Sequence, residues 1–284
     1  MLTSLSSAVS GLDAFQQQMD IIGKNIANLN TTGFKSATGN LADSFSNTLQ
    51  AATASTSSSN PGTNPMQIGT GVNTISITND WAQGTINPTG VSSNLAINGN
   101  GFFVVQDPSS TAQYATQDGT FTLNNNGNLV TSNGMLVQGY SNTGLSTLGP
   151  IVINTQGMPS TSSPTATMTS YSISSSGTIT VNLSDGTSFV RGQILLQNFQ
   201  NPQALVNQGS NLYSNMTNAG PLTALTAPGS SGLGTIQSGA LELSNVDLAA
   251  QMADLIVAQR GFEANSKIVT TSDELLQDVV NMKR

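Results

Sequence analysis

Carboxylates and hydroxyls are the side-chain groups in this sequence that could do chemistry. The 284 residues include 14 Asp and Glu, four Lys and three Arg, but no His and no Cys. Those absences exclude Ser-His-Asp and Cys-His nucleophile systems, thiolate zinc sites, Cys-ligated iron–sulfur clusters, haem on an axial His and disulfide bonds. The chemistry left to an enzyme is that of a carboxylate pair, which glycoside hydrolases use.

Three aspartates in the middle of the chain are the candidates for such a pair. Asp107, Asp118 and Asp185 each adjoin Pro or Gly, and this is the composition of tight turns. We therefore interpret them as turn residues and predict no catalytic residue, no cofactor and no metal site. The alternative, a secreted carboxylate-dependent carbohydrate-active enzyme, requires a cleft with two acidic residues within reach and a raised pKa on one of them.

Charge and hydropathy also limit the partners. The net charge is −7 with no basic cluster, so a nucleic-acid partner is not expected, because such binding depends on Lys and Arg at phosphates. No uncharged apolar run approaches the ~18 residues of a membrane span, so we predict no membrane insertion. The first basic residue is Lys24, so the sequence lacks the positively charged n-region of a secretory signal peptide. We therefore expect that any export proceeds without a cleaved signal peptide.

The middle of the chain has the pattern of an antiparallel β domain. Residues 51–239 contain five charges, and the whole chain has 37 Ser, 34 Thr and 30 Asn. Short β-branched and aromatic runs, such as 74–77, 101–105 and 177–181, alternate with Asn- and Gly-rich turns. Period-two runs bounded by such turns predict strands joined by hairpins, and Asp185-Gly186 is a type I′ turn signal. We assign residues 71–240 to this domain.

Both ends of the chain predict long amphipathic helices. Each carries apolar residues spaced seven apart, which is the periodicity of a helix packed along one seam. The N-terminal helix should end near residues 28–30, where Asn-rich turn residues follow, and residues 244–247 supply a capping box for the C-terminal one. The predicted self-assembly residues are Leu5, Leu12, Met19, Ile26, Leu248, Leu255, Phe262, Val269 and Leu276.

These stripes have two interpretations. A heptad stripe on a terminal helix most often packs on its own domain's core. Stripes at both ends of one chain favour mutual pairing as an antiparallel coiled coil, with further copies of the chain covering the remaining apolar flank. The predicted fold is therefore α+β: a terminal coiled-coil domain of 1–35 with 241–284, a linker of 36–70 and a central antiparallel β domain. The linker is Ser-rich, and it is either flexible or ordered only on assembly.

Several motifs resemble the bacterial flagellar rod and hook axial proteins. They cover about half the chain, in the family's order. At the N-terminus they are SGLD (10–13) and MDIIGKNIANLNTTGFK (19–35), and in the β domain they are LAINGNGFFVV (95–105) and the stretch 114–140. At the C-terminus they are SNVDL (244–248) and QRGFEANSK (259–267). By this resemblance, Asn25, Asn28, Asn30, Gly33 and Phe34 belong to the family motif. The three asparagines are expected either to cap the helix or to contact neighbouring subunits.

Within this family the sequence favours a hook subunit, with a distal rod subunit as the alternative. Residues 271–284 and 41–46 resemble hook proteins, whereas the insertion between Lys35 and Gln67 resembles the distal rod as well, and the chain is short for a hook. The hook interpretation implies a flexible torque-transmitting joint that forms the extracellular hook. An exported adhesin that stays monomeric is a further alternative.

The resemblance also implies partners. They are copies of the chain in a hollow helical tube, rod and hook–filament junction proteins, the hook cap, and the flagellar type III export apparatus. Phe45 and Leu49 match an apolar pattern associated with export-gate recognition in this system, and a simple amphipathic turn explains them equally.

Overall fold

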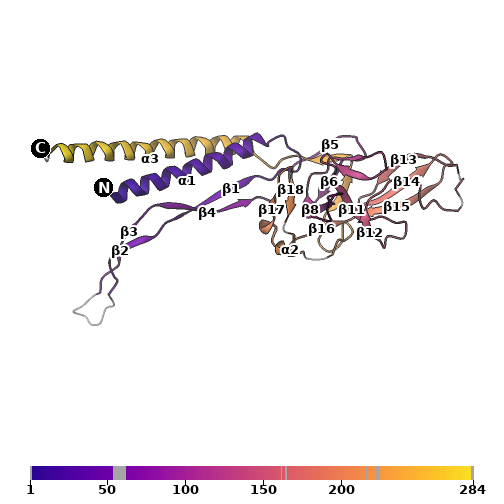
Figure 1. The fold of residues 1–284 in the computed structure, drawn as a ribbon, viewed down its shortest axis with the longest axis horizontal. Helices are drawn as coiled ribbons and strands as arrows, with labels where there is room; N and C mark the ends of the chain where they lie inside the picture. Colours follow the sequence, from indigo (N-terminus) through magenta and orange to yellow (C-terminus); the bar gives the residue numbers. More distant parts are fainter. Residues whose placement is uncertain are drawn as a thin grey trace. The chain divides into compact units, whose positions relative to one another are not determined.

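The protein has the α+β fold predicted from its sequence (Figure 1). The computed structural model describes residues 2–53, 62–160, 162–163, 165–214, 216–221 and 224–282. The chain forms two compact units. One, here the helical unit, comprises Met1–Ala27, Ser36–Asp80 and Val246–Arg284; the other, here the β unit, comprises Asn28–Lys35 and Trp81–Asn245.

Two long helices form most of the helical unit. Helix α1 spans Leu2–Ala27 and α3 spans Leu248–Met282. After α1 the Thr31 amide donates to the Asn28 carbonyl at 3.1 Å, so the chain turns where the Asn-rich segment predicts it. Asp247 caps α3, because its Oδ1 accepts hydrogen bonds from the amides of Ala249 (2.9 Å) and Ala250 (3.3 Å). A side chain, that of Asp247, therefore sets the start of α3, whereas a backbone turn follows the end of α1.

A two-part β-hairpin completes the helical unit. Strand β1 (Ala37–Asp43) pairs antiparallel with β4 (Val72–Asn79), and β2 (Ser46–Gln50) pairs with β3 (Met66–Gly69). Hydroxyl and amide side chains link β1 to β4, as between Thr38 and Thr78 at 3.1 Å. Residues 36–70, expected as a linker, thus contain three strands, and the strand expected at 74–77 pairs within this hairpin. Residues 54–61, in the Ser-rich part of that segment, lie outside the described residues.

The β unit is built on antiparallel pairs throughout its described residues. Its main sheet has the strand order β13-β14-β15-β11-β7-β8-β18-β17, with β9, β10, β12 and β16 attached beside that path, and two further pairs join β19 to β6 and β20 to β5. The bounds are β5 Ile86–Pro88, β6 Leu95–Asn98, β7 Phe102–Gln106, β8 Gln113–Thr116, β9 Phe121–Leu123, β10 Leu129–Thr131, β11 Leu136–Tyr140, β12 Leu148–Pro150, β13 Met168–Ile173, β14 Thr178–Leu183, β15 Ser188–Ile194, β16 Leu196–Gln197, β17 Val206–Asn207, β18 Leu212–Ser214, β19 Thr235–Ser238 and β20 Ala240–Glu242, with short helical turns at Pro202–Ala204 and Met216–Ala219.

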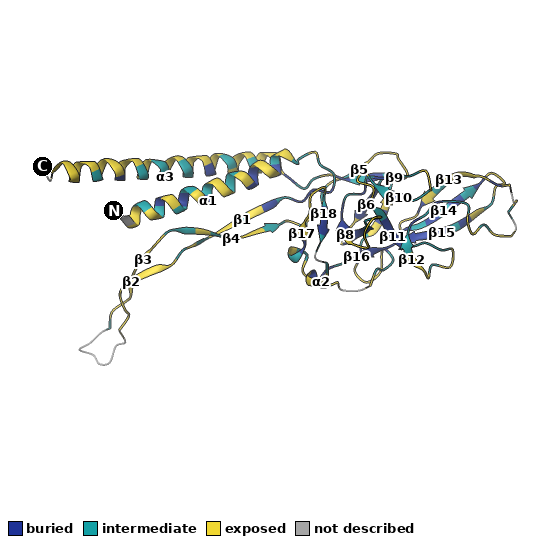
Figure 2. Cartoon of the chain, in the orientation of Figure 1, coloured by how far each residue is buried: buried dark blue, intermediate teal, exposed yellow. Residues whose placement is uncertain are grey.

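The core of the β unit gathers the apolar residues of these short strands (Figure 2). Phe103 and Phe121 meet edge to face with ring centroids 5.1 Å apart, and Leu95, Ile97 and Leu129 are fully buried around them. A turn does join β14 to β15 at Asp185-Gly186, but the predicted type I′ geometry is wrong: Gly186 has φ +83°, whereas Asp185 lacks the positive φ that a type I′ turn requires at both central residues. The β unit therefore holds its own hydrophobic core.

Candidate self-assembly surfaces

Helices α1 and α3 pack against each other in opposite directions. The Asn25 amide nitrogen donates to Gln251 Oε1 at 2.9 Å, while Gly11 faces Asn265 and Gly261 faces the ring of Phe15. The partner's number falls as the number on α1 rises, so the register is antiparallel, as Figure 1 shows for these helices. Glycine at two crossing points lets the helix backbones approach closely, because no Cβ lies between them.

The predicted stripe residues lie along this packing without being fully covered. Eight of the nine are half-buried, and Leu248 is exposed. Most of the fully buried residues of the two helices have small side chains. The other face of α1 packs on the hairpin, where Ile21 contacts Gly39. The half-buried stripe residues are Leu5, Leu12, Met19, Ile26, Leu255, Phe262, Val269 and Leu276.

A large apolar surface of the helical unit remains exposed. Helix α3 carries it along most of its length, and the hairpin carries a second part (Figure 2). Exposed apolar side chains gathered on two elements in this way indicate an interaction surface. The exposed residues are Leu248, Met252, Ile256, Val257, Ile268, Leu275, Val279, Val280 and Met282 on α3, and Leu41, Phe45, Leu49, Met66, Ile68, Ile75 and Ile77 on the hairpin.

Asn25 holds the start of the hairpin to α1. It is 1% exposed; its Nδ2 donates to the Ala37 carbonyl at 2.8 Å and its Oδ1 accepts from the Ala37 amide at 3.0 Å. This two-bond pairing ties β1 to α1 within the subunit, so Asn25 is not the helix cap that its position near the end of α1 suggests. Asn28 Oδ1 accepts from the Thr31 hydroxyl at 3.1 Å, and Asn30 is exposed.

Gly33 and Phe34 belong to the β unit. Gly33 has φ +66°, its amide donates to the Glu242 carbonyl at 2.9 Å, and a Cβ there would meet the backbone of Gln117 and Asp118 within 3 Å. Phe34 is buried next to it. A residue other than glycine at position 33 would be strained both by its backbone angle and by this close approach.

An ion pair that was not predicted from the sequence lies next to Gly33. Lys35 Nζ is 2.7 Å from Glu242 Oε1, and the two side chains are 2% and 3% exposed. Lys35 also donates to the Ala82 carbonyl at 2.9 Å, and the Gly84 amide donates to the same Glu242 oxygen at 2.8 Å. Three chain segments of the β unit, 33–35, 82–84 and 242, are therefore held at one carboxylate.

The comparisons with known proteins match this arrangement along the whole chain. Three family models match: "Flagella basal body rod protein" at residues 5–35, "Flagellar hook protein FlgE/F/G D1 domain" at 96–181 and "Flagellar basal body rod FlgEFG protein C-terminal" at 237–282. The flagellar basal-body rod protein FlgG of Bacillus subtilis is 40% identical over 284 residues, covering 100% of both chains. This chain belongs to the flagellar rod and hook axial family.

Other relatives separate the rod from the hook. The FlgG rod protein of Buchnera aphidicola subsp. Baizongia pistaciae is 38% identical over 278 residues, 98% of each chain. The hook protein FlgE of Borreliella burgdorferi is 27% identical over an alignment of 447 positions that covers 100% of both chains. Since this chain has 284 residues, that hook protein has long segments without a counterpart here. The relatives thus favour the rod alternative over the hook interpretation.

The protein is an axial structural subunit of the flagellum and not an enzyme, as its family shows. The aspartates agree with this. A hydrogen bond from the Ser109 amide holds the pKa of Asp107 below its ordinary value, and one from the Thr187 hydroxyl does the same for Asp185. A general acid needs the opposite shift. Within the described residues there is no cluster of acidic side chains that could hold a metal ion, and no helix long and apolar enough to cross a membrane.

The close approach of α1 and α3 at Gly261 gives a first testable prediction. We expect Gly261→Val to weaken the helix packing, because the new side chain would meet three atoms of the Phe15 ring within 3 Å. Overpacking of this kind costs about 1–3 kcal/mol. The measurement is helix content by circular dichroism during thermal unfolding, with Ala264→Val, an exposed position on α3, as control. Equal melting of the two variants would contradict the close contact.

Proposed function

We propose that this protein is a distal rod subunit of the bacterial flagellum, which polymerises into a hollow helical tube that transmits torque. The observation that carries the proposal is the match to a rod protein over the full length of both chains, at 40% identity. The hook protein matches at lower identity and needs a much longer alignment.

The proposal assigns assembly to the helical unit. We propose that α1 and α3 form an antiparallel coiled coil through the eight half-buried stripe residues, and that the exposed apolar residues of α3, Leu248 among them, and of the hairpin pack on neighbouring copies. Such contacts join different patches of identical subunits, and a contact of this type that does not close into a ring generates an open helical polymer. The β unit, with its own core, would occupy the outside of the tube.

The exposed apolar side chains of the hairpin favour the proposal of a stiff polymer over that of a flexible one. It exposes Phe45 (89% exposed) and six further apolar side chains. Apolar contacts exclude water and pack densely, whereas contacts through Ser, Thr and Asn exchange hydrogen bonds with water as surfaces slide. Subunits joined through this hairpin would resist sliding past one another, and a rod that transmits torque requires this resistance. Recognition of Phe45 and Leu49 by the export apparatus is a separate proposal for the same segment.

The proposed partners are copies of the chain, the rod and hook subunits at the two ends of its tube, and the flagellar type III export apparatus. The hook cap and the hook–filament junction proteins belong to the hook interpretation and are not part of this proposal.

The position of the subunit in the flagellum tests the proposal. An epitope inserted after Gly186, in the exposed β14–β15 turn, should be labelled by gold-coupled antibody on purified hook–basal bodies. We expect label on the rod, on the cell side of the hook, and none along the hook. Label distributed along the curved hook would overturn the rod assignment and support the hook alternative.

A further inference from the structure

Four Asn-Gly steps occur in this sequence, all of them in the β unit. An asparagine followed by glycine is prone to deamidation, because glycine has no side chain to hinder the attack of its amide nitrogen on the asparagine carboxamide. In an unfolded chain the four steps are chemically alike, so the fold decides which of them reacts first. They are Asn98-Gly99, Asn100-Gly101, Asn126-Gly127 and Asn133-Gly134.

Hydrogen bonds protect three of these four steps. All four asparagines are exposed, so exposure does not distinguish them. Three of the glycine amides, however, donate a hydrogen bond that must break before the nitrogen can attack the carboxamide. The donors and acceptors are Gly99 with Gln83 Oε1 at 3.1 Å, Gly127 with the Asn124 carbonyl at 2.9 Å and Gly134 with the Thr131 carbonyl at 2.9 Å.

The Asn100-Gly101 step lacks this protection. Among the described residues the Gly101 amide donates to no acceptor, and the Asn100 carboxamide makes no hydrogen bond. The carbonyl of the peptide that joins them accepts a hydrogen bond from the Gly234 amide at 2.7 Å. That bond polarises the peptide, so the Gly101 N–H gives up its proton more readily. The nucleophile and the carboxamide that it attacks are therefore both unrestrained at this step alone among the four.

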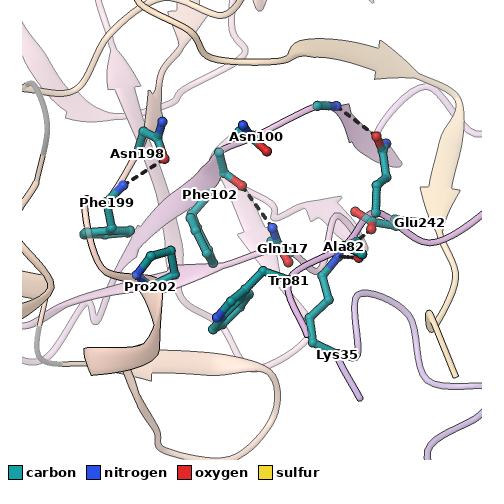
Figure 3. A pocket seen from close by; sticks show the side chains of 13 residues that line it. Lys35, Trp81, Ala82, Asn100, Phe102, Gln117, Asn198, Phe199, Pro202 and Glu242 are labelled. Carbon is teal, nitrogen blue, oxygen red and sulfur yellow. Dashed lines mark hydrogen bonds and ion pairs between the residues drawn. The ribbon is translucent and has the colours of Figure 1, made fainter. Parts of the chain in front are cut away.

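A cavity of about 320 Å³ in the β unit gives this step access to water (Figure 3). Both Asn100 and Gly101 line it, together with polar side chains such as those of Gln83 and Asn198. Its volume far exceeds what one water molecule needs, and a polar cavity of this size can hold water. Gly101 is buried, so the cavity is the route by which solvent reaches it.

We propose that Asn100 is the residue at which the folded protein deamidates. The Gly101 nitrogen loses its proton to hydroxide and attacks Asn100 Cγ, so that a new C–N bond closes a succinimide ring. The carboxamide nitrogen takes a proton from water and leaves as ammonia. A second water then opens the ring at either carbonyl and gives aspartate or isoaspartate at position 100. One water is consumed and one ammonia released overall, and no other reactant is needed.

The products change the backbone at the start of strand β7. Isoaspartate adds one methylene to the main chain directly before Gly101, where space is limited: a Cβ at Gly101 would lie 3.2 Å from Leu233 and 3.5 Å from Leu196. Strand β7 lies inside the main sheet, between β11 and β8. Either product also adds a carboxylate to a cavity that Glu242 lines. Deamidation therefore marks aged copies of the chain with a less stable β unit.

Peptide mass spectrometry of the full-length, folded wild-type chain during incubation at mildly alkaline pH tests the proposal. We expect conversion at Asn100 to be about five- to tenfold faster than at Asn98, Asn126 or Asn133, the effect on a rate of one net hydrogen bond. The matched control is the same chain unfolded in guanidinium chloride, where the four residues should convert at similar rates. Equal rates in the folded chain, or an unreacted Asn100, would overturn the proposal.

A pair of variants gives a second test that needs no peptide mapping. Asn100→Gln keeps a carboxamide at an exposed position, but its longer side chain closes the ring far more slowly. We expect this variant to lose most of the acidic species that wild type accumulates on isoelectric focusing, and to keep its melting temperature during incubation. Asn133→Gln, also at an exposed position, should age like wild type. If the two variants accumulate acidic species equally, Asn100 is not the site. Both tests hold whether or not the chain polymerises.

Discussion

Replacement of Glu242 by alanine is expected to lower the free energy of unfolding of the β unit by about 3–5 kcal/mol, the usual effect of removing one partner of a buried ion pair. The Lys35 ammonium is 2% exposed and would be left without its opposite charge. The Gly84 amide would lose its acceptor as well. For a unit of this size the melting temperature should fall by about 10 °C, which thermal unfolding followed by calorimetry at neutral pH would measure.

The chain supplies a matched control for this prediction. Arg260 and Glu263 on α3 form an ion pair of similar length, 2.8 Å, but their side chains are 76% and 63% exposed. We expect Glu263→Ala to change the free energy of unfolding by less than about 1 kcal/mol, because water screens an exposed pair. The double variant Lys35→Met with Glu242→Met should lose less than Glu242→Ala, since it leaves no buried charge. Similar losses from Glu242→Ala and Glu263→Ala would show that burial of the pair does not matter.

The Lys35–Glu242 ion pair is a feature of the fold that could not be predicted from the sequence. Heptad spacing at the two ends and period-two runs between Asn- and Gly-rich turns predicted the helices and the β unit, because those patterns are local. Lys35 and Glu242 are 207 positions apart, and neither residue type nor spacing marks them as partners. A single Lys directly after Phe34, in a segment that is otherwise uncharged, is the one signal that could have drawn attention to the site.

The hairpin was missed for a related reason. The Thr74–Ile77 run was correctly predicted to be a strand, but its partner in β1 lies more than 30 residues earlier, across a Ser-rich segment that suggests a linker. Asn25 was expected to act as a cap or to contact a neighbouring subunit, because an amide near a helix end does so most often. Its pairing with Ala37 depends on where β1 returns to α1, and only the folded chain sets that position.

Deletion of residues 246–284 is expected to abolish polymerisation and to leave the β unit folded. The deletion removes α3, and with it the C-terminal stripe and the exposed face that includes Val257 (67% exposed). The β unit ends at Asn245 and keeps its core and the Lys35–Glu242 pair. Sedimentation and electron microscopy would measure the polymer, and near-ultraviolet circular dichroism would measure the fold. Normal tubes from the deleted chain would contradict the assembly role of α3.

The corresponding deletion at the N-terminus must stop at residue 27. Deleting 2–27 removes α1 but leaves Gly33 and Lys35, which are bonded to Glu242 in the β unit, so we expect lost assembly and a stable β unit. Deleting 2–35 removes Lys35 and should destabilise the β unit as well, since Glu242 would then be the unpaired buried charge. The difference in melting temperature between these two deletions measures how much the segment after α1 contributes to the β unit.

A point variant separates the exposed face of α3 from its packing on α1. Val257→Asp places a charge on that face, where the monomer has water, so the isolated chain should keep its helix content. Assembly through that face would strip the carboxylate of its hydration, and we expect polymerisation to fail. Gln259→Asp, an exposed polar position two residues away, adds the same charge and should assemble. If both aspartate variants assemble equally well, then the exposed apolar residues of α3 are not the contact between copies, and the hairpin must supply it.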